Sequence, residues 1–262
     1  FSDYDGGPTK TFGYQFVGNR NSVLLKSENA GAKIVRLDDK LEWLLPSSKE
    51  YNDFKFSASS NWLTAKRKLA NSDSESPALW QIENGNRLLG DPKLIDGIKG
   101  NLNFDSLEKF AFGTNSDGTG VLAVSLDNLT TQEIPGGQRS QSLYGVSPDG
   151  RWVVTGGIHK TQLALWNTRL VPFEKPVFID GYRSPNPSNQ GQEQLTFSKT
   201  GNWLAMSDIN GSTATLWNLK SPTRQGTLLV GHVGGIQQIV FSPDDKWLVT
   251  TSSDNTARLW FL

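Results

Sequence analysis

The chain has 262 residues, with 26 basic and 26 acidic side chains and no formal net charge. A balanced charge gives no overall field that would draw a protein to nucleic acid or to an acidic membrane, so we expect neither as a partner. The sequence has no cysteine and only two histidines, which excludes disulfides, thiolate catalysis and zinc–thiolate sites and leaves few ligands for a transition metal. It has no run of 18 apolar residues that would predict a membrane-spanning helix. The absence of cysteine is typical of proteins of the reducing cytoplasm, which is the location that we expect.

A short pattern recurs six times along the chain. In each copy an apolar residue ends a predicted strand and a turn rich in serine, proline, aspartate, glycine or asparagine follows. In five copies an aromatic residue lies six positions after that apolar residue. In chain order, the apolar marker residues are Phe16, Phe56, Phe104, Val146, Phe197 and Phe241. They lie 40, 48, 42, 51 and 44 residues apart, which indicates copies of one supersecondary unit that stack to bury their apolar faces.

Eight of the nine tryptophans fall at two recurrent places in these copies, and Trp43 is the exception. The first place, six residues after the marker, holds Trp62, Trp152, Trp203 and Trp247. The second, farther downstream, holds Trp80, Trp166, Trp217 and Trp260. In the two weak copies we expect Leu37 and Val124 at the second place. Tryptophan fills wide gaps between packed elements, so we interpret these residues as packing residues and not as a surface that stacks on a ligand.

Within each copy the apolar residues alternate or form short blocks, which predicts strands. In the last copy we expect strands at 236–241, 246–251 and 256–261, and the copy before it ends with a short outer strand at 227–230. Segments 115–118, 147–150 and 242–245 combine aspartate with glycine or proline, as chain reversals require. No long stretch has helical periodicity. The sequence therefore predicts an all-β protein built from four-stranded antiparallel units.

The chain resembles the WD-repeat β-propellers. The residues that carry the resemblance are Gly231-His232, the FSPDD turn at 241–245, Asp254, and Leu259-Trp260. The endings ALW (78–80), LALW (163–166) and ATLW (214–217) repeat the last of these features. The resemblance covers essentially the whole chain and is strongest in the last copy and weakest in the first. The style of the last copy is similar to bacterial members of the family, which are often fused to kinase, protease-like or nucleotide-hydrolysing signalling modules.

The resemblance implies a structural hydrogen-bond tetrad of histidine, serine or threonine, aspartate and tryptophan. Carried over to this sequence, its members are His232, Ser252, Asp254 and Trp260. The only other histidine is His159, so no other copy can have the complete tetrad. The resemblance therefore implies a divergent propeller in which most blades are held by packing alone.

The resemblance also implies one propeller domain over residues 1–262, with six four-stranded antiparallel blades. The expected blades are approximately 6–50, 51–93, 94–134, 135–180, 181–230 and 231–262. Residues 1–5 are expected to close the ring as the outer strand of the last blade, because Gly6 precedes Phe16 by ten residues, as Gly231 precedes Phe241. The alternative is a segment of a ring of seven or more blades. Because the chain begins with phenylalanine, we expect it to be a domain of a longer protein.

The expected function is that of a non-enzymatic protein-interaction platform, the scaffold or sensor domain of a larger signalling or regulatory protein. Its partner would be another protein or other domains of the same polypeptide. No catalytic motif is present, and the sequence predicts no catalytic residue, cofactor or metal. The alternative is a propeller enzyme of the hydrolase or lactonase type, with its active site at the central channel. That function would require acids or histidines that converge from several blades, typically around a metal.

Two insertions are candidates for partner binding, because loops on a rigid scaffold commonly carry binding sites. The second copy contains an expanded turn at 66–78, and the link from the fourth to the fifth copy contains a polar segment at 180–194. Arginine and tyrosine are favoured at protein interfaces. The candidate partner-binding residues are Lys66, Arg67, Lys68, Tyr182 and Arg183. The alternative interpretation is a solvated run of charges and a polar loop.

Overall fold

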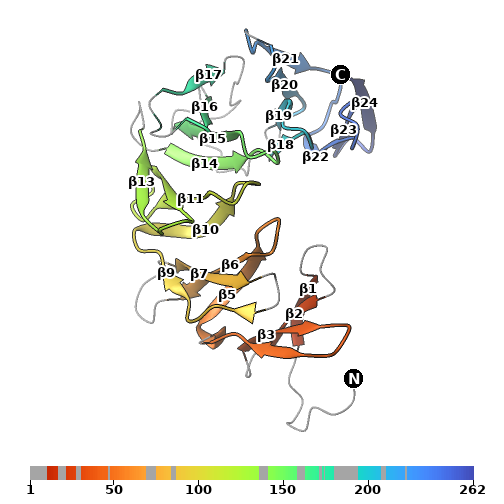
Figure 1. Cartoon of the computed structure of the whole chain (residues 1–262). Coiled ribbons are helices and arrows are strands. Elements are labelled where there is room, and N and C mark those ends of the chain that lie inside the picture. The colour runs from red at the N-terminus through yellow and green to blue at the C-terminus, as the bar shows by residue number, and fades with distance from the viewer. Residues whose placement is uncertain are drawn as a thin grey trace. The chain divides into compact units, whose positions relative to one another are not determined.

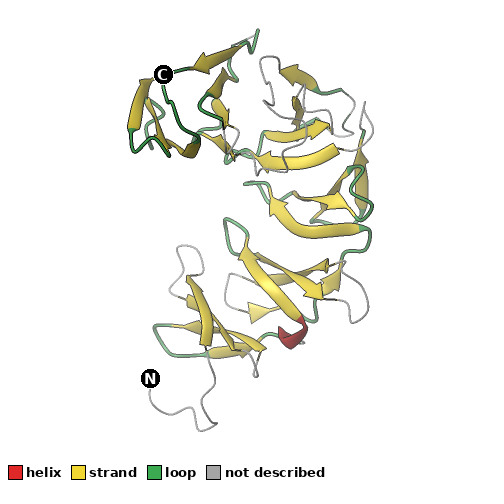
Figure 2. Ribbon diagram, turned by 180° about the vertical axis from the view of Figure 1, so that it is seen from behind, coloured by secondary structure: helices red, strands yellow, loops and turns green. Residues whose placement is uncertain are grey.

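The structure is a computed structural model, and it describes residues 11–16, 22–27, 31–46, 48–68, 75–83, 87–135, 141–157, 163–170, 173, 175–179, 194–207, 211–221 and 223–262. These residues form antiparallel β-sheets, and their one helical segment is the short 3-10 helix η1 (Ser48–Glu50), drawn in red in Figure 2. No helix in this part of the chain is long and apolar enough to cross a membrane. The chain divides into two compact units, unit 1 at residues 1–104 and unit 2 at residues 105–262.

The first two sheets lie in unit 1 (Figure 1). The first sheet has the strand order β1-β2-β3-β4, with β1 (Thr11–Phe16), β2 (Ser22–Ser27), β3 (Gly31–Arg36) and β4 (Glu42–Leu44). The second sheet contains β5 (Tyr51–Phe56), β6 (Trp62–Lys68), β7 (Glu75–Glu83), β8 (Arg87–Leu88) and β9 (Lys93–Leu94). The long strand β7 has two short partners on its outer edge, because β9 pairs with its first half and β8 with its last residues.

The remaining sheets repeat the same up-and-down order. The third contains β10 (Ile98–Phe104), β11 (Phe110–Asn115), β12 (Val121–Ser125) and β13 (Thr131–Ile134). The fourth contains β14 (Gln141–Val146), β15 (Trp152–Gly157), β16 (Leu163–Asn167) and β17 (Val177–Ile179). The fifth contains β18 (Gln194–Phe197), β19 (Trp203–Ser207), β20 (Ala214–Asn218) and β21 (Gly226–Leu229), and the last has three described strands, β22 (Ile236–Phe241), β23 (Trp247–Ser252) and β24 (Ala257–Phe261). The predicted all-β fold of four-stranded antiparallel units is confirmed. Residues 1–5, the predicted closing strand, lie outside the described residues.

Every marker residue ends the first strand of a sheet, and the residue six positions later begins the second strand. In five sheets this spacing has a common cause, which is the polar residue that directly follows the marker. Its side-chain oxygen accepts a hydrogen bond from the backbone N–H of the first residue of the second strand, at 2.9 to 3.2 Å. The five residues are Ser57, Asp105, Ser147, Ser198 and Ser242. The four-residue reversal is therefore closed by both a side chain and the backbone, and this fixes the length of the turn.

The insertion in the second copy differs from its prediction as a loop. Strand β6 continues to Lys68 and β7 begins at Glu75, with Lys66 opposite Pro77 and Lys68 opposite Glu75. Much of the inserted sequence therefore lengthens the hairpin. Hydrogen bonding between the two strands satisfies backbone groups that a loop would leave to water.

The second set of tryptophans fills the seams between neighbouring sheets within each unit. Trp80 packs in a cluster formed by the first two sheets, Trp166 in one formed by the third and fourth, and Trp217 in one formed by the fourth and fifth. All three are at most 1% exposed. Trp260 is half-buried against the cluster of the fifth and last sheets.

The strand register identifies the second tryptophan place in the two weak copies. In the other copies, the tryptophan at this place faces the residue seven positions after the marker. Val124 faces Ala111 in this way, so it stands where the sequence predicted. The prediction of Leu37 is wrong. Leu37 lies beyond the end of β3 and is exposed, whereas Val35 faces Val23 and occupies the place.

One face of the last sheet is apolar and open to solvent, and we call it the last-sheet apolar face. It consists of Val240, Trp247, Leu259 and Phe261, which are 53%, 38%, 61% and 73% exposed. Trp247 and Phe261 are cross-strand neighbours whose rings meet edge to face at 5.0 Å. The opposite face of the same sheet, with Ile239 and Leu248, packs against the fifth sheet. Trp247 thus departs from the expectation that this tryptophan is a seam-filling residue.

Candidate interaction surface and its supporting networks

The last repeat contains a chain of hydrogen bonds that links a tryptophan, a hydroxyl, a histidine and an aspartate. The indole Nε1 of Trp260 donates to Thr250 Oγ1 at 3.0 Å, and His232 Nε2 lies 2.9 Å from the same oxygen. His232 Nδ1 lies 3.0 Å from Asp254 Oδ2. Thr250 and His232 are buried, so the chain connects the sheet to the segment that precedes it.

The hydroxyl in this chain is that of Thr250, and the prediction of Ser252 is wrong. Trp260 faces Leu248 across the sheet, so Thr250 is the nearest hydroxyl on the same face. Ser252 lies two residues, or about 7 Å, farther along β23. Its hydroxyl instead donates to the carbonyl of Gly234 at 2.8 Å and accepts from the backbone N–H of Asp254 at 3.2 Å. Ser252 therefore holds the turn that presents Asp254.

Asp254 is held in its ionised form. A hydrogen bond from the Thr256 hydroxyl, together with others from the Val233 N–H and from His232, keeps the pKa of Asp254 well below its usual range. Burial acts in the opposite direction but is outweighed. A single carboxylate thus fixes both the turn after β23 and the segment that leads into β22.

The equivalent positions in other sheets retain part of this set of hydrogen bonds or none of it. Thr155 and Thr250 both stand nine residues after their markers, and Trp166 Nε1 donates to Thr155 Oγ1 at 2.9 Å. Ala65 stands at the equivalent place in the second sheet, and the buried Nε1 of Trp80 has no hydrogen-bond partner among the described residues. His159 lies outside those residues.

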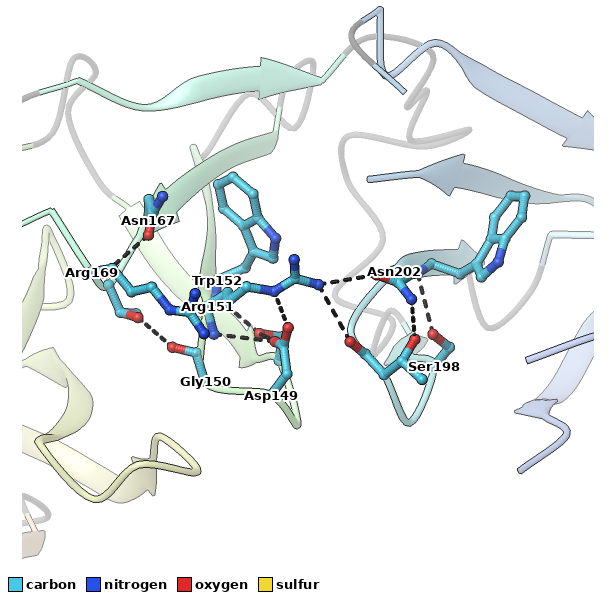
Figure 3. A network of polar contacts seen from close by, with 12 residues as sticks. Asp149, Gly150, Arg151, Trp152, Asn167, Arg169, Ser198 and Asn202 are labelled. Carbon is cyan, nitrogen blue, oxygen red and sulfur yellow. Dashed lines mark hydrogen bonds and ion pairs between the residues drawn. The ribbon is translucent and has the colours of Figure 1, made fainter. Parts of the chain in front are cut away.

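A second polar network joins the first turns of the last three sheets, and part of it is drawn in Figure 3. Arg151 is paired with Asp149 in its own turn, and its Nη2 donates to Asn202 Oδ1 of the next turn at 3.0 Å. Ser198 donates to Asp245 Oδ2 of the following turn at 2.8 Å.

The turns also approach one another closely. Gly201 has φ +69°, and a Cβ built on it would lie 2.4 Å from Asp149 Oδ1. Burial would raise the pKa of Asp149, but hydrogen bonds from Ser147 and Arg151 outweigh it and keep this pKa below its usual value. This second network therefore locks neighbouring turns together and leaves few of its polar atoms for a ligand.

The structure does not describe two of the predicted partner-binding residues, and the other three are consecutive residues of β6. Lys66 lies on β6 with its Nζ 3.7 Å from Asp53 Oδ2, and its side chain is only 25% exposed. Arg67 and Lys68 are also strand residues of β6, and Tyr182 and Arg183 lie outside the described residues. Nor does the described part of the chain contain a group of three or more His, Cys, Asp or Glu side chains that could hold a metal ion.

A comparison with protein families gives a match where the tetrad lies. The family model described as "WD domain, G-beta repeat" matches residues 223–260, which include His232, Thr250, Asp254 and Trp260. The chain contains a WD repeat at residues 223–260. Its antiparallel four-stranded sheets have the blade architecture of β-propellers.

Several curated proteins are similar in sequence to part of this chain. A U4/U6 small nuclear ribonucleoprotein PRP4-like protein of Arabidopsis thaliana is 38% identical over 77 residues, which are 28% of this chain and 14% of that protein. The nuclear distribution protein PAC1 of Arthroderma otae is 27% identical, over 58% of this WD-repeat chain and 38% of that protein. An uncharacterized WD repeat-containing protein of the cyanobacterium Synechocystis is 27% identical, over 51% of this chain and 35% of that protein. The chain thus spans less than two fifths of the length of each of these relatives.

Proposed function

We propose that this WD-repeat chain is a non-enzymatic platform for protein–protein interaction, the scaffold or sensor domain of a larger signalling or regulatory protein. The observation that carries the proposal is the set of large apolar side chains that the blades expose. Leu44, Phe178 and Leu228 lie on outer strands and are 67%, 51% and 57% exposed. These outer-strand side chains are accessible to a partner protein, and burial of apolar surface is the main driving force of most protein–protein association.

The polar side chains of the blades support the same function. The two networks described above engage His232, Thr250 and three aspartates in structural hydrogen bonds, so these groups hold the scaffold in place. WD-repeat proteins bind other proteins in complexes, and the names of the ribonucleoprotein and nuclear distribution relatives are in keeping with such a role. We place this function in the cytoplasm, in keeping with a chain that has no cysteine.

We retain Arg67, Lys68, Tyr182 and Arg183 as proposed partner contacts. Lys66 is a weaker candidate because of its proximity to Asp53. The test is co-purification of the tagged intact chain from its own cells, with native mass spectrometry of the product. A partner protein in fixed stoichiometry, weakened when the four residues are changed to alanine, is the expected result. Recovery of the chain without any stoichiometric protein would overturn the platform function, whereas unchanged recovery by the variant would overturn only these contacts.

We further propose that the six sheets are the blades of one closed ring, with residues 1–5 as the outer strand of the last blade. The last-sheet apolar face supports this proposal, since in the other sheets of unit 2 the equivalent tryptophans, Trp152 and Trp203, pack against the next sheet. If the face is covered in solution, Phe261→Ser will destabilise the chain by about 2–4 kcal/mol. Leu170→Ser, at a turn residue of similar exposure, is the control and should change stability by less than about 0.5 kcal/mol. Equal small effects for both variants would mean that no blade covers the face.

A further inference from the structure

The outer strands of unit 1 border an open groove of about 560 Å3, which we call the Trp43 groove. It is lined by Glu42, Trp43, Leu44, Pro46, Leu88 and Asp91. β4 supplies three of these residues and is the outermost strand of the first sheet, while β8 is a short edge strand of the second sheet. A volume in the range of roughly 300 to 1,000 Å3 is typical of ligand sites in proteins.

Trp43 is the one tryptophan that stands outside the two recurrent places of the repeat. It is half-buried and packs against the core of unit 1 on one side. The guanidinium carbon of Arg36 lies 5.4 Å from the centre of its ring, and Asp39 holds that guanidinium through two contacts. The indole is therefore fixed in orientation by the protein itself, so a ligand would meet a preorganised aromatic wall.

The lining of the groove combines apolar and acidic side chains. Leu44 is 67% exposed, and Leu88 packs against the core behind the groove. Both charged residues of the lining, Glu42 and Asp91, are acidic. Lys33 already pairs with Glu42 at 2.8 Å, whereas Asp91 makes no ion pair with any side chain that the structure describes.

We propose that the Trp43 groove binds an extended segment of a partner protein in which an arginine or lysine lies beside an apolar residue. This inference rests on the platform function proposed above. The apolar residue would cover Leu44 and Leu88, and the methylene stem of the basic side chain would lie along Trp43. Its charged head would reach Asp91, which is the one charge of the lining that the described side chains leave unpaired.

Each part of this recognition has a physical basis. Long basic side chains place their stems on apolar surface while the charged head stays hydrated or meets a carboxylate. A cation near an indole and a hydrogen bond to an ionised carboxylate both favour arginine or lysine over a neutral residue. The short edge strand β4 also offers unpaired backbone groups to an extended segment, as in peptides that add a strand to a sheet.

The test uses a phage-displayed library of random linear peptides selected on the immobilised intact chain. The dissociation constant of the enriched peptide is then measured by fluorescence polarisation for the parent and for single variants. Asp91→Asn removes the charge with little change in shape, and we expect it to weaken binding by roughly three- to tenfold. Leu44→Ser removes an exposed apolar contact and should weaken binding by about tenfold.

Matched controls lie in the same unit but outside the groove. Asp96→Asn changes an exposed carboxylate and Leu94→Ser an exposed leucine, and both should leave the dissociation constant unchanged. All four positions are exposed, so the variants are expected to keep the parent circular dichroism spectrum.

The outcomes separate this inference from the platform function. Enriched peptides that contain arginine or lysine next to an apolar residue, and that respond to Asp91→Asn and Leu44→Ser but not to the controls, support the groove. Peptides that bind saturably but ignore both groove variants, or that lack a basic residue, overturn the groove and leave the platform function intact. If the co-purification yields a stoichiometric partner but the library yields no enriched peptide, the groove is likewise overturned and the platform function stands.

Discussion

The identity of the hydroxyl that bonds Trp260 and His232 can be tested quantitatively, because Thr250 and Ser252 are both candidates. Thr250→Val keeps the shape of the side chain and removes Oγ1, which leaves Trp260 Nε1 and His232 Nε2 without their shared partner. A buried polar group left unpaired costs about 1–3 kcal/mol. His232 is buried and carries the full cost, while the half-buried Trp260 can turn toward water, so we expect a loss of about 2–4 kcal/mol.

Ser252→Ala is expected to cost less, about 1 kcal/mol, because the groups that it releases lie near the surface and can bind water. Thr251→Val changes a neighbouring threonine on the other face of β23 and should cost less than about 0.5 kcal/mol. The assay is urea unfolding followed by far-ultraviolet circular dichroism, with the change in unfolding free energy taken from the shift of the midpoint. A loss for Ser252→Ala that equals or exceeds the loss for Thr250→Val would refute the assignment of the hydroxyl.

Three further predictions concern the turns. Gly201→Ala should destabilise the chain by about 2–4 kcal/mol, since it adds a clash with Asp149 to backbone strain. Gly118→Ala, with a similar φ but open space, should cost about 1–2 kcal/mol in the same urea assay. Equal losses would contradict the close approach of the turns. Because the pKa of Asp254 is lowered in the folded state, its charge stabilises the fold above pH 3.8, the unfolded value, and this contribution is lost as the pH falls through the lower folded value. In an acid titration, the stability advantage of the parent over Asp254→Asn should therefore shrink. An advantage that stays constant would be inconsistent with the lowered pKa. Burial raises the pKa of Asp105, so its charge lowers the stability of the fold above the folded pKa, and this cost fades as the pH falls toward 3.8. Asp105→Asn should therefore be at least as stable as the parent at pH 7. A large loss of stability at that pH would argue against the raised pKa.

The sequence predicts the repeat and its strands well because the signals are local. A marker and an aromatic residue six positions later define a hairpin, and the turn residue that closes it is adjacent to the marker. The third strand also follows from alternation, and the strand predicted at 236–241 is β22 with the same bounds. These features depend on a few neighbouring residues, which a sequence displays directly.

The errors concern placement across strands, which depends on register. Leu37 was expected where Val35 stands, because the weak first copy has no tryptophan to fix the register of β3. Ser252 was expected where Thr250 stands, because only the pairing of β23 with β24 brings one of the two hydroxyls to Trp260. The Trp43 groove has no sequence signature at all, although the position of Trp43 outside the repeat pattern could have drawn attention to it.

The function proposed for this chain depends on a partner protein that covers part of its surface without being converted. Hydrogen–deuterium exchange of the intact chain, alone and in the complex purified from its own cells, measures that coverage directly. We predict slower exchange over β4 and β8 in the complex, with no change at Thr250 in the core of the last repeat. Exchange that is the same in both states along the whole chain would contradict the platform function.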